Sequence, residues 1–391
     1  MAKQKSSLVV PVGLDATVDG EAFSRAASFV ARLCPTSAVR PEHMAIHVEA
    51  GDKALVLTVF NGLQAARRTV PATVRQGGAV LCDGRLGHLQ AQGETQVCVQ
   101  EVKSANHLGV YFGRASLRFG LLPETPIWPE FPATSGEIRA ADLDDAVGAV
   151  IWSCGGSAGM RWPLNSVQIW IESGRLRSYA LSGPSAALFE RVVGKGDISR
   201  VAVPQDFCQT IRALCAEDRD AVISIGVVGG ALILQAPGCT IFTPTHDNLA
   251  PIIPGLLADS PVECATFSPG ELDGLLSHTK LVQDKLSSRV DVQLRDDALE
   301  VRSMGAVHGD SEVQVDIESV QEPAQVACAL EYLSAVCAAL KGLGESANIR
   351  VGGPSDPLMF FTDEVRFLVA PINPGRGQVE NREEPGEEKI T

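Results

Sequence analysis

The sequence predicts an α+β protein built from three repeated domains, each with two helices and antiparallel strands. The main observation is an internal repeat: six short amphipathic helix candidates begin near residues 19, 83, 141, 204, 268 and 327, a period of roughly 60 residues. Strand-like hairpin sequence follows each candidate, and the order, spacing and hairpin ends recur together. Six copies of one helix-plus-strands unit favour a pseudo-symmetric ring or arc over an enzyme built around one cleft.

The first helix of each pair is predicted at residues 19–33, 140–154 and 268–282. Apolar residues recur at helical spacing, as Leu272 and Leu276 show in the third copy. Asp19 and Ser268 stand at N-cap positions, and Glu271 follows Ser268 by three residues, as in a capping box. We expect each helix to lead into a hairpin, with second arms at residues 54–62, 175–183 and 298–305.

The second helices are predicted at residues 83–92, 204–217 and 327–340, each followed by a strand pair such as residues 223–244. The segment 83–92 is the weakest of them, because Gly84 and Gly87 lower its helix propensity. Chance similarity among short amphipathic helices is the alternative interpretation of the repeat.

Proline-rich stretches at 123–135 and 248–261 mark the seams between domains. We therefore predict domains at residues 1–132, 133–258 and 259–375, and a disordered acidic tail at 376–391.

Composition is that of a protein with ordinary packed cores. The chain has 391 residues, 45% of them hydrophobic and 20% charged, which is enough for two or three such cores. No apolar run reaches the roughly 18 residues that a membrane span needs. The opening segment has only a short apolar part, which ends at Pro11, so we expect no signal peptide. The ten cysteines include no C-x-x-C pair, which indicates a reduced, cytoplasmic protein without disulfides or structural zinc.

Signals of an enzyme or of a nucleic-acid coat are weak in this chain. The net charge of −14 argues against a protein that coats nucleic acid, but it is compatible with a locally basic channel. Residues 154–159 (CGGSAG) could pass for a nucleophile elbow or a phosphate loop, yet they follow a helix and lack the P-loop lysine, so we expect a turn. Asp142, Asp144 and Asp145 stand at a helix start, where carboxylates interact favourably with the helix dipole. We predict no catalytic residues, no metal and no cofactor.

From about residue 10 to residue 372, the chain resembles the bacterial DNA polymerase III beta subunits, the β sliding clamps, as a divergent member. Residues 39–72 resemble the family's Arg-Pro turn, hairpin and closing Thr-Val-Pro, and residues 118–132 resemble its exit into the second domain. Residues 161–183 are the most similar stretch, and residues 330–342 and 367–372 resemble the last helix and the C-terminal strand. The resemblance implies a three-domain DNA clamp fold. Two chains would join head to tail in a pseudo-six-fold ring, with helices lining the hole and sheets forming the outer wall.

The resemblance further implies a non-enzymatic processivity factor, associated with the nucleoid, that encircles duplex DNA without reading its sequence. Such a protein needs cations that face phosphates. Arg40 matches the Arg-Pro turn, and Arg161 and Trp162 lie where the family has an Arg followed by aromatics that reach DNA. The full set of DNA-binding candidates is Arg25, Arg32, Arg40, Arg67, Arg68, Arg161, Trp162, Arg212, Lys280 and Lys341. For each cation the alternative is an ordinary surface charge, and for Trp162 it is a core side chain.

The resemblance also implies an apolar pocket, which accepts short linear peptides from polymerases, the clamp loader and repair proteins. By position it would consist of Leu164, Leu181, Gly183, Pro184, Ser185, Ala186, Ile252, Leu368, Ala370, Pro371 and Ile372; inter-domain core is the alternative. The chain departs from the family here, because residues 181–186 read LSGPSA where the family usually has Thr-Asp-Gly-His-Arg-Leu. Ala370 also replaces a bulkier residue, so the preferred peptide motif is expected to differ, as in a second copy that serves a specialised partner.

Ring closure would involve Phe119 and Leu121 on one side and Leu281 and Val282 on the other, with intramolecular packing as the alternative. An edge strand from each side should also pair across the seam, because an unpaired edge invites aggregation. The alternative function is a clamp-fold adaptor or inhibitor that binds partner peptides or another clamp without encircling DNA. The altered pocket and acidic charge favour that alternative, whereas the surviving Arg40, Arg67, Arg68 and Arg161 favour the clamp.

Overall fold

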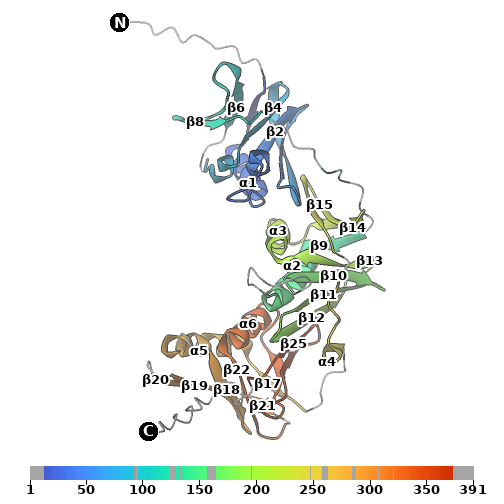
Figure 1. Ribbon diagram of the computed structural model, residues 1–391, viewed down its shortest axis with the longest axis vertical. Coiled ribbons are helices and arrows are strands. Elements are labelled where there is room, and N and C mark those ends of the chain that lie inside the picture. Colours follow the sequence, from blue (N-terminus) through green and yellow to red (C-terminus); the bar gives the residue numbers. More distant parts are fainter. Residues whose placement is uncertain are drawn as a thin grey trace, which may run out of the picture. The chain divides into compact units, whose positions relative to one another are not determined.

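The computed structural model describes residues 13–372, except 92, 94–95, 124–128, 130, 132–133, 135, 156–163, 195, 247, 258–262, 284–287, 306–308 and 320. The chain forms two compact units (Figure 1). The first unit comprises Met1–Val147, Ser166–Ser178 and Arg191–Leu249, and the second comprises Gly148–Asn165, Tyr179–Glu190 and Ala250–Thr391. The predicted domain boundaries at 132/133, 258/259 and 375/376, and the acidic tail, lie outside the described residues and stay predictions.

Two of the predicted first helices begin at the caps that the sequence indicates. Helix α1 (Gly20–Ala31) starts after Asp19, whose Oδ1 accepts a hydrogen bond from the Ala22 N–H at 2.8 Å. Helix α5 (Pro269–Val282) starts after Ser268, whose hydroxyl accepts from the Glu271 N–H at 3.4 Å. Each cap satisfies a backbone donor that the first helical turn leaves free, and the predicted starts are confirmed.

The remaining helices follow the predicted order with small shifts. Helix α2 (Ala140–Val150) continues into the 3-10 turn η4 (Ile151–Ser153), and α3 spans Gln205–Cys215. Helix α6 (Leu330–Lys341) begins three residues later than expected, because Ala327–Ala329 complete strand β22 (Ala324–Ala329). A short helix, α4 (Pro254–Leu257), lies within the segment expected to be a seam.

The helix predicted at residues 83–92 is wrong: the segment forms only the five-residue 3-10 turn η2 (Gly84–His88). Both glycines sit where the backbone approaches its neighbours. A Cβ on Gly84 would lie 2.3 Å from the Met44 carbonyl oxygen, and one on Gly87 would lie 2.1 Å from the Ala31 Cβ. Close packing of η2 against α1 therefore requires glycine, and the same glycines weaken a longer helix.

The first unit is organised by one antiparallel sheet, which among the described residues has the strand order β8-β7-β6-β1-β4-β16-β15-β14-β9, with β2, β3 and β5 attached at its side. Its strands are β1 (Asp15–Val18), β2 (Ala45–Gly51), β3 (Ala54–Phe60), β4 (Ala65–Gln76), β5 (Gly78–Asp83), β6 (Val97–Val102), β7 (His107–Phe112), β8 (Ala115–Gly120), β9 (Gly136–Arg139), β14 (Val222–Val228), β15 (Ala231–Ala236) and β16 (Cys239–Pro244). Strand β4 joins its two halves, because it pairs with β1 and β3 and also with β16 from the Cys239–Arg68 to the Phe242–Ala65 pair. Strand β10 (Ser166–Glu172) pairs with β13 (Ile198–Pro204) in the same unit, and the 3-10 turns η1 (Pro41–Met44) and η3 (Lys103–Ala105) complete it.

The second unit contains two antiparallel sheets. Strands β11 (Arg175–Leu181) and β12 (Ser185–Val192) carry the chain between the units. In the first sheet β12 pairs with β25 (Val365–Val369), followed by β24 (Leu358–Phe361), β23 (Ala347–Arg350), β17 (Ala265–Phe267) and β21 (Glu318–Ser319). The second sheet has the order β20 (Gly309–Asp316), β19 (Ala298–Gly305), β18 (Arg289–Leu294) and β22. Hairpins were predicted at residues 54–62, 175–183 and 298–305, and strands β3, β11 and β19 confirm their second arms.

Apolar side chains of helices and sheets pack together in both units. Phe23 of α1 and Phe207 of α3 are fully buried in the first unit, and Phe360 and Phe367 are fully buried in the second. The architecture is α+β with antiparallel sheets, as predicted. None of the helices within the described ranges has the length and apolar character of a membrane span.

Candidate functional site

The predicted peptide pocket maps entirely onto the second unit, where β12 and β25 lie side by side. Ser185 pairs with Val369 and Ala186 pairs with Leu368. Beyond β25 the chain stays beside the same segment, because the Ala370 N–H donates to the Pro184 carbonyl oxygen at 2.8 Å. The structure therefore brings residues 183–186 and 368–371 together, although they are far apart in the sequence.

Exposure divides these residues into a floor and a rim. Ser185, Ala186 and Leu368 are buried. Gly183 is exposed, and the remaining candidates are partly exposed: Leu164, Leu181, Pro184, Ile252, Ala370, Pro371 and Ile372. The Tyr179 hydroxyl donates to the Pro251 carbonyl oxygen at 3.1 Å, which fixes the backbone next to Ile252. Partly exposed apolar side chains beside buried Ala186 and Leu368 suit an apolar peptide anchor.

Beneath this surface lies a cluster of three buried serines that sequence reasoning missed. The Ser185 hydroxyl lies 3.0 Å from the hydroxyl of Ser153 and 2.7 Å from that of Ser182. The Ser182 N–H also donates to the Ser185 carbonyl oxygen at 2.8 Å, which closes the turn between β11 and β12. The available signal was serine at positions 182 and 185, where the family has Asp and Arg. The floor here is polar but uncharged.

Several predicted DNA-binding cations already have a carboxylate partner. Arg25 lies 3.1 Å from Glu21, Arg212 lies 3.0 Å from Asp144, and Lys341 lies 3.2 Å from Asp273. The side chains of Arg32, Arg40 and Lys280 are exposed. Arg161 and Trp162 lie outside the described residues.

Arg67 and Arg68 lie where β4 meets β16 and are partly buried. The Arg67 guanidinium is 4.6 Å from the centre of the Phe131 ring. The Arg68 guanidinium is 4.7 Å from the centre of the Phe29 ring and also forms an ion pair with Glu217. These contacts give both side chains a packing role at the junction of the two halves of the sheet.

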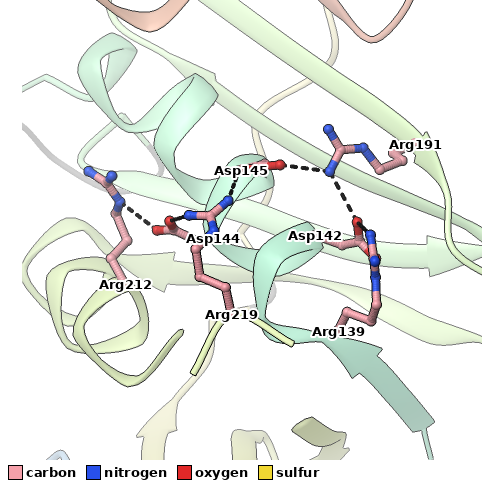
Figure 2. A network of polar contacts seen from close by, with 7 residues as sticks. All are labelled: Arg139, Asp142, Asp144, Asp145, Arg191, Arg212 and Arg219. Carbon is pink, nitrogen blue, oxygen red and sulfur yellow. Dashed lines mark hydrogen bonds and ion pairs between the residues drawn. The ribbon is translucent and has the colours of Figure 1, made fainter. Parts of the chain in front are cut away.

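A polar cluster of the first unit surrounds the start of α2, where four guanidinium groups converge on three aspartates (Figure 2). Arg139 donates to Asp142 at 3.0 and 3.1 Å, and Arg191 donates to Asp142 at 3.0 Å and to Asp145 at 2.8 Å. Arg219 donates to Asp144 at 2.6 Å and to Asp145 at 2.8 Å. With Arg212, these residues form what we call the arginine–aspartate network: Arg139, Asp142, Asp144, Asp145, Arg191, Arg212 and Arg219.

The network connects β9, α2, β12, α3 and the loop after α3. Burial tends to raise the pKa of the Asp142 carboxyl, but the hydrogen bonds from Arg139 and Arg191 outweigh it and lower the pKa below its ordinary value of 3.8. The sequence predicted that the helix dipole would favour these carboxylates. Their arginine partners come from positions 139, 191, 212 and 219, and no local pattern in the sequence links those positions.

The predicted dimer residues differ in their surroundings. Phe119 lies on β8, at one end of the sheet order among the described strands, and is partly exposed. Leu121 forms an isolated bridge with Cys82, which agrees with intramolecular packing. Leu281 is 78% exposed at the end of α5, and its neighbour Val282 is partly exposed. An apolar side chain as exposed as Leu281 is available for contact with another molecule.

Two chemical roles, metal binding and nucleophilic attack by Cys154, can be compared with the described part of the chain. No group of three His, Cys, Asp or Glu side chains there could hold a metal ion. Cys154, which opens the glycine-rich segment, is buried, and burial raises its pKa to about 12. A thiol with that pKa stays protonated at neutral pH, whereas the thiolate is the nucleophile.

No protein-family model and no curated protein matches the chain. Solved structures do match. A DNA polymerase III beta subunit from Thermotoga maritima is 16% identical, with a TM-score of 0.82 over 92% of this chain and 99% of that one. A sliding clamp from Pseudomonas aeruginosa bound to griselimycin is 17% identical, with a TM-score of 0.81 over 92% and 100%. A sliding clamp from Bacillus subtilis is 15% identical, with a TM-score of 0.78 over 92% and 99%. The fold expected from the sequence resemblance is therefore confirmed over nearly the whole chain.

Proposed function

We propose that this chain, which has the fold of the bacterial DNA polymerase III beta subunits, is a divergent sliding clamp. It would encircle duplex DNA without reading its sequence and tether polymerase, clamp-loader and repair proteins to it. The observation that carries the proposal is the fold match over 92% of this chain and 99% of a beta subunit. Because one fold can serve several functions, the local features of this chain must support the proposal as well.

The pairing of β12 with β25 supports the tethering role. It places Leu368 and Ala370 next to Pro184 and Ala186, although these residues are far apart in the sequence. Burying one large apolar anchor of a peptide against such residues contributes about 1.5–3 kcal/mol. The uncharged floor around Ser185 supports a peptide preference that differs from that of the family.

Two strand edges support assembly into a ring. Among the described residues β8 pairs only with β7, and β20 pairs only with β19. Leu281 follows the part of α5 that contacts β20, where the Thr279 and Ser311 hydroxyls lie 3.1 Å apart. We propose that β8 of one subunit pairs with β20 of the next, with Phe119 and Leu281 at the seam, in a head-to-tail homodimer. Such a heterologous contact closes into a ring when its rotation permits.

On this proposal the chain is a binding scaffold with no active site, found in the cytoplasm in association with the nucleoid. Arg32, Arg40 and Lys280 are the exposed cations proposed to face phosphates, together with Arg25, Arg212 and Lys341, which have carboxylate partners. Arg161 and Trp162 keep the roles that the resemblance implies.

A second candidate is an adaptor or inhibitor with the clamp fold that binds partner peptides or another clamp without encircling DNA. The observation in its favour is that Arg25, Arg212 and Lys341 are each paired with a carboxylate, which weakens their attraction for phosphate.

The deciding experiment compares retention on circular and linearised duplex DNA after incubation with a clamp loader and ATP, with the mass in solution measured alongside. A sliding clamp is a dimer that stays on circles and is lost from linear ends. A monomer, or a dimer never retained on circles with any loader tried, would support the adaptor. Retention on linear DNA equal to that on circles would indicate ordinary binding and also contradict encirclement.

A further inference from the structure

In the arginine–aspartate network, guanidinium groups that would attract DNA phosphates are hydrogen-bonded to carboxylates that would repel them. A single carboxylate, Asp144, holds two arginines: its Oδ1 accepts from Arg212 Nε at 3.0 Å, and its Oδ2 accepts from Arg219 Nη1 at 2.6 Å (Figure 2). Asp145 holds the other terminal nitrogen of Arg219 at 2.8 Å. Both arginines are therefore engaged by side chains of α2 in the absence of DNA.

Arg139 and Arg219 lie nearer to solvent than the aspartates that they bind, whereas Arg191 and Asp145 are about equally exposed. The side chains of Arg139 and Arg219 are 60% and 51% exposed, whereas those of Asp142 and Asp144 are 7% and 11% exposed. Three carboxylates and four guanidinium groups leave one net positive charge. Exposed Asp218 and Asp220 flank Arg219 in the chain, so the network does not form a cationic patch of its own.

Donors remain available on this surface. Arg212 uses Nε for Asp144, and within the described residues its two terminal nitrogens contact no other group. A phosphate that approached Arg212 or Arg219 would compete with Asp144 for the same cation. Arginine forms strong charge-assisted hydrogen bonds with either anion, so the carboxylate weakens the attraction between arginine and phosphate without removing the donor.

We propose that Asp144 and Asp145 act as an electrostatic brake on DNA affinity. They hold Arg212 and Arg219 in place and compete with DNA phosphates for them, so that the ring contacts the backbone weakly and remains free to move along it. Arg219, which the sequence did not single out, becomes a DNA-facing cation, and Asp144 becomes a positioning residue. The inference rests on the proposed function, because it requires α2 and α3 to face DNA.

Other cations proposed to face DNA also form ion pairs with carboxylates, which argues that such pairs do more than stabilise the contacts of α2. Arg25 of α1 pairs with Glu21 of the same helix, and Lys341 of α6 pairs with Asp273 of α5. In each case a cation proposed to face DNA has a carboxylate within 3.2 Å.

The test is Asp144→Asn, which keeps the shape of the side chain and removes its charge. Affinity of the full-length chain for a short duplex is measured by fluorescence anisotropy over a range of salt concentrations. We expect roughly threefold to tenfold tighter binding. A plot of log K against log salt should also be steeper by about 0.9 for each additional phosphate that the variant neutralises. Unchanged or weaker binding by a folded Asp144→Asn would overturn the brake.

The matched control is Asp291→Asn, which changes the net charge equally. Asp291 lies 2.8 Å from Arg289, and the Arg289 side chain is 42% exposed, as is that of Arg212. Both control residues lie on strand β18 and not on a helix. If Asp291→Asn tightens binding as much as Asp144→Asn, net charge alone explains the effect and the brake is contradicted.

A triple variant, Asp144→Asn with Arg212→Gln and Arg219→Gln, tests whether the tighter binding depends on the arginines. We expect the triple variant to lose the added affinity, and persistence of that affinity would contradict the proposal. If thermal unfolding shows that Asp144→Asn does not fold, Asp145→Asn takes its place in the same comparison; it removes the charge that binds one Arg219 nitrogen and Arg191. Retention of the wild-type chain on circular DNA tests encirclement separately. Tighter duplex binding by Asp144→Asn without such retention would show that Asp144 limits DNA affinity, but it would contradict the ring and therefore the role of the brake in movement along DNA.

Discussion

The hydroxyl of Ser153 lies 3.0 Å from the hydroxyl of Ser185, and both side chains are buried near the start of β12, where it pairs with β25. Ser185 also lies 2.7 Å from Ser182, so it is the central member of the cluster. A buried hydroxyl that loses its partner keeps the cost of its desolvation. Ser185 is therefore expected to stabilise the serine cluster more than Ser153 or Ser182 does.

We predict that Ser185→Ala lowers the free energy of unfolding by about 1–3 kcal/mol, because it removes the hydroxyl that both neighbours contact. Urea denaturation followed by circular dichroism measures the change. Ser182→Ala is the control, since it leaves the contact between Ser153 and Ser185 intact and should cost less. An equal loss for both variants would show that the central position of Ser185 has no energetic consequence.

The proposed peptide-binding surface is tested by placing a large charged side chain at Ala370. Ala370 is partly exposed, and its N–H, which donates to Pro184 at 2.8 Å, is unaffected by a change of side chain. We expect Ala370→Arg to reduce affinity for a synthetic clamp-binding peptide from a bacterial replicative polymerase by tenfold or more, about 1.4 kcal/mol, with little change in stability. Isothermal titration calorimetry gives both affinities. The control is Asp363→Arg, which adds the same side chain in the turn before β25 and should bind the peptide as the wild type does. Equal peptide affinities for the two variants would place the peptide site elsewhere.

The sequence predicted most of the elements because their signals are local. Asp19 and Ser268 cap α1 and α5 as expected, since a cap depends on residues three positions apart. The helix predicted at residues 83–92 is wrong because tertiary contacts determine the conformation there. Gly84 and Gly87 allow close approach to Met44 and Ala31, and only a 3-10 turn forms.

The candidate site shows the same division between local and distant signals. That Ala186 and Leu368 lie close together was anticipated only through the resemblance to a family, because nothing near either residue specifies the other. The partners of Asp144 and the serine cluster were not anticipated at all. Ser153 and Ser185 are 32 positions apart, and Asp144 and Arg212 are 68 positions apart. No periodic pattern in the sequence encodes contacts over such separations.

The proposed seam between subunits is tested by placing a positive charge at Leu281. Leu281 is an exposed apolar side chain beside the edge formed by β20, so a lysine there should be tolerated by the isolated chain and opposed in a dimer. We expect Leu281→Lys to shift the mass measured by analytical ultracentrifugation toward the monomer while the melting temperature of the monomer is unchanged. Val222→Lys, at another exposed apolar position on β14, should remain dimeric. A dimeric Leu281→Lys would exclude the proposed seam.

Asp142 should make folding sensitive to acid. Although burial opposes ionisation, the hydrogen bonds from Arg139 and Arg191 lower its pKa in the folded state below the ordinary 3.8. A lowered carboxyl pKa contributes stability that is present above the unfolded-state value and is lost as the pH falls through the folded-state value. Asp142→Asn removes this contribution, so at neutral pH the variant should be less stable than the wild type by roughly 1.5–3 kcal/mol.

The difference between the two proteins should then shrink as the pH falls below the ordinary carboxyl pKa of 3.8, because the wild type loses what the variant already lacks. Urea unfolding at several pH values measures it, and Asp363→Asn, which changes a carboxylate in a turn, serves as the control. A gap between wild type and Asp142→Asn that stays constant over this range would mean that Asp142 stabilises the fold through its shape and not through its charge. A shrinking gap would identify the start of α2 as a point where ionisation of Asp142 and folding are coupled.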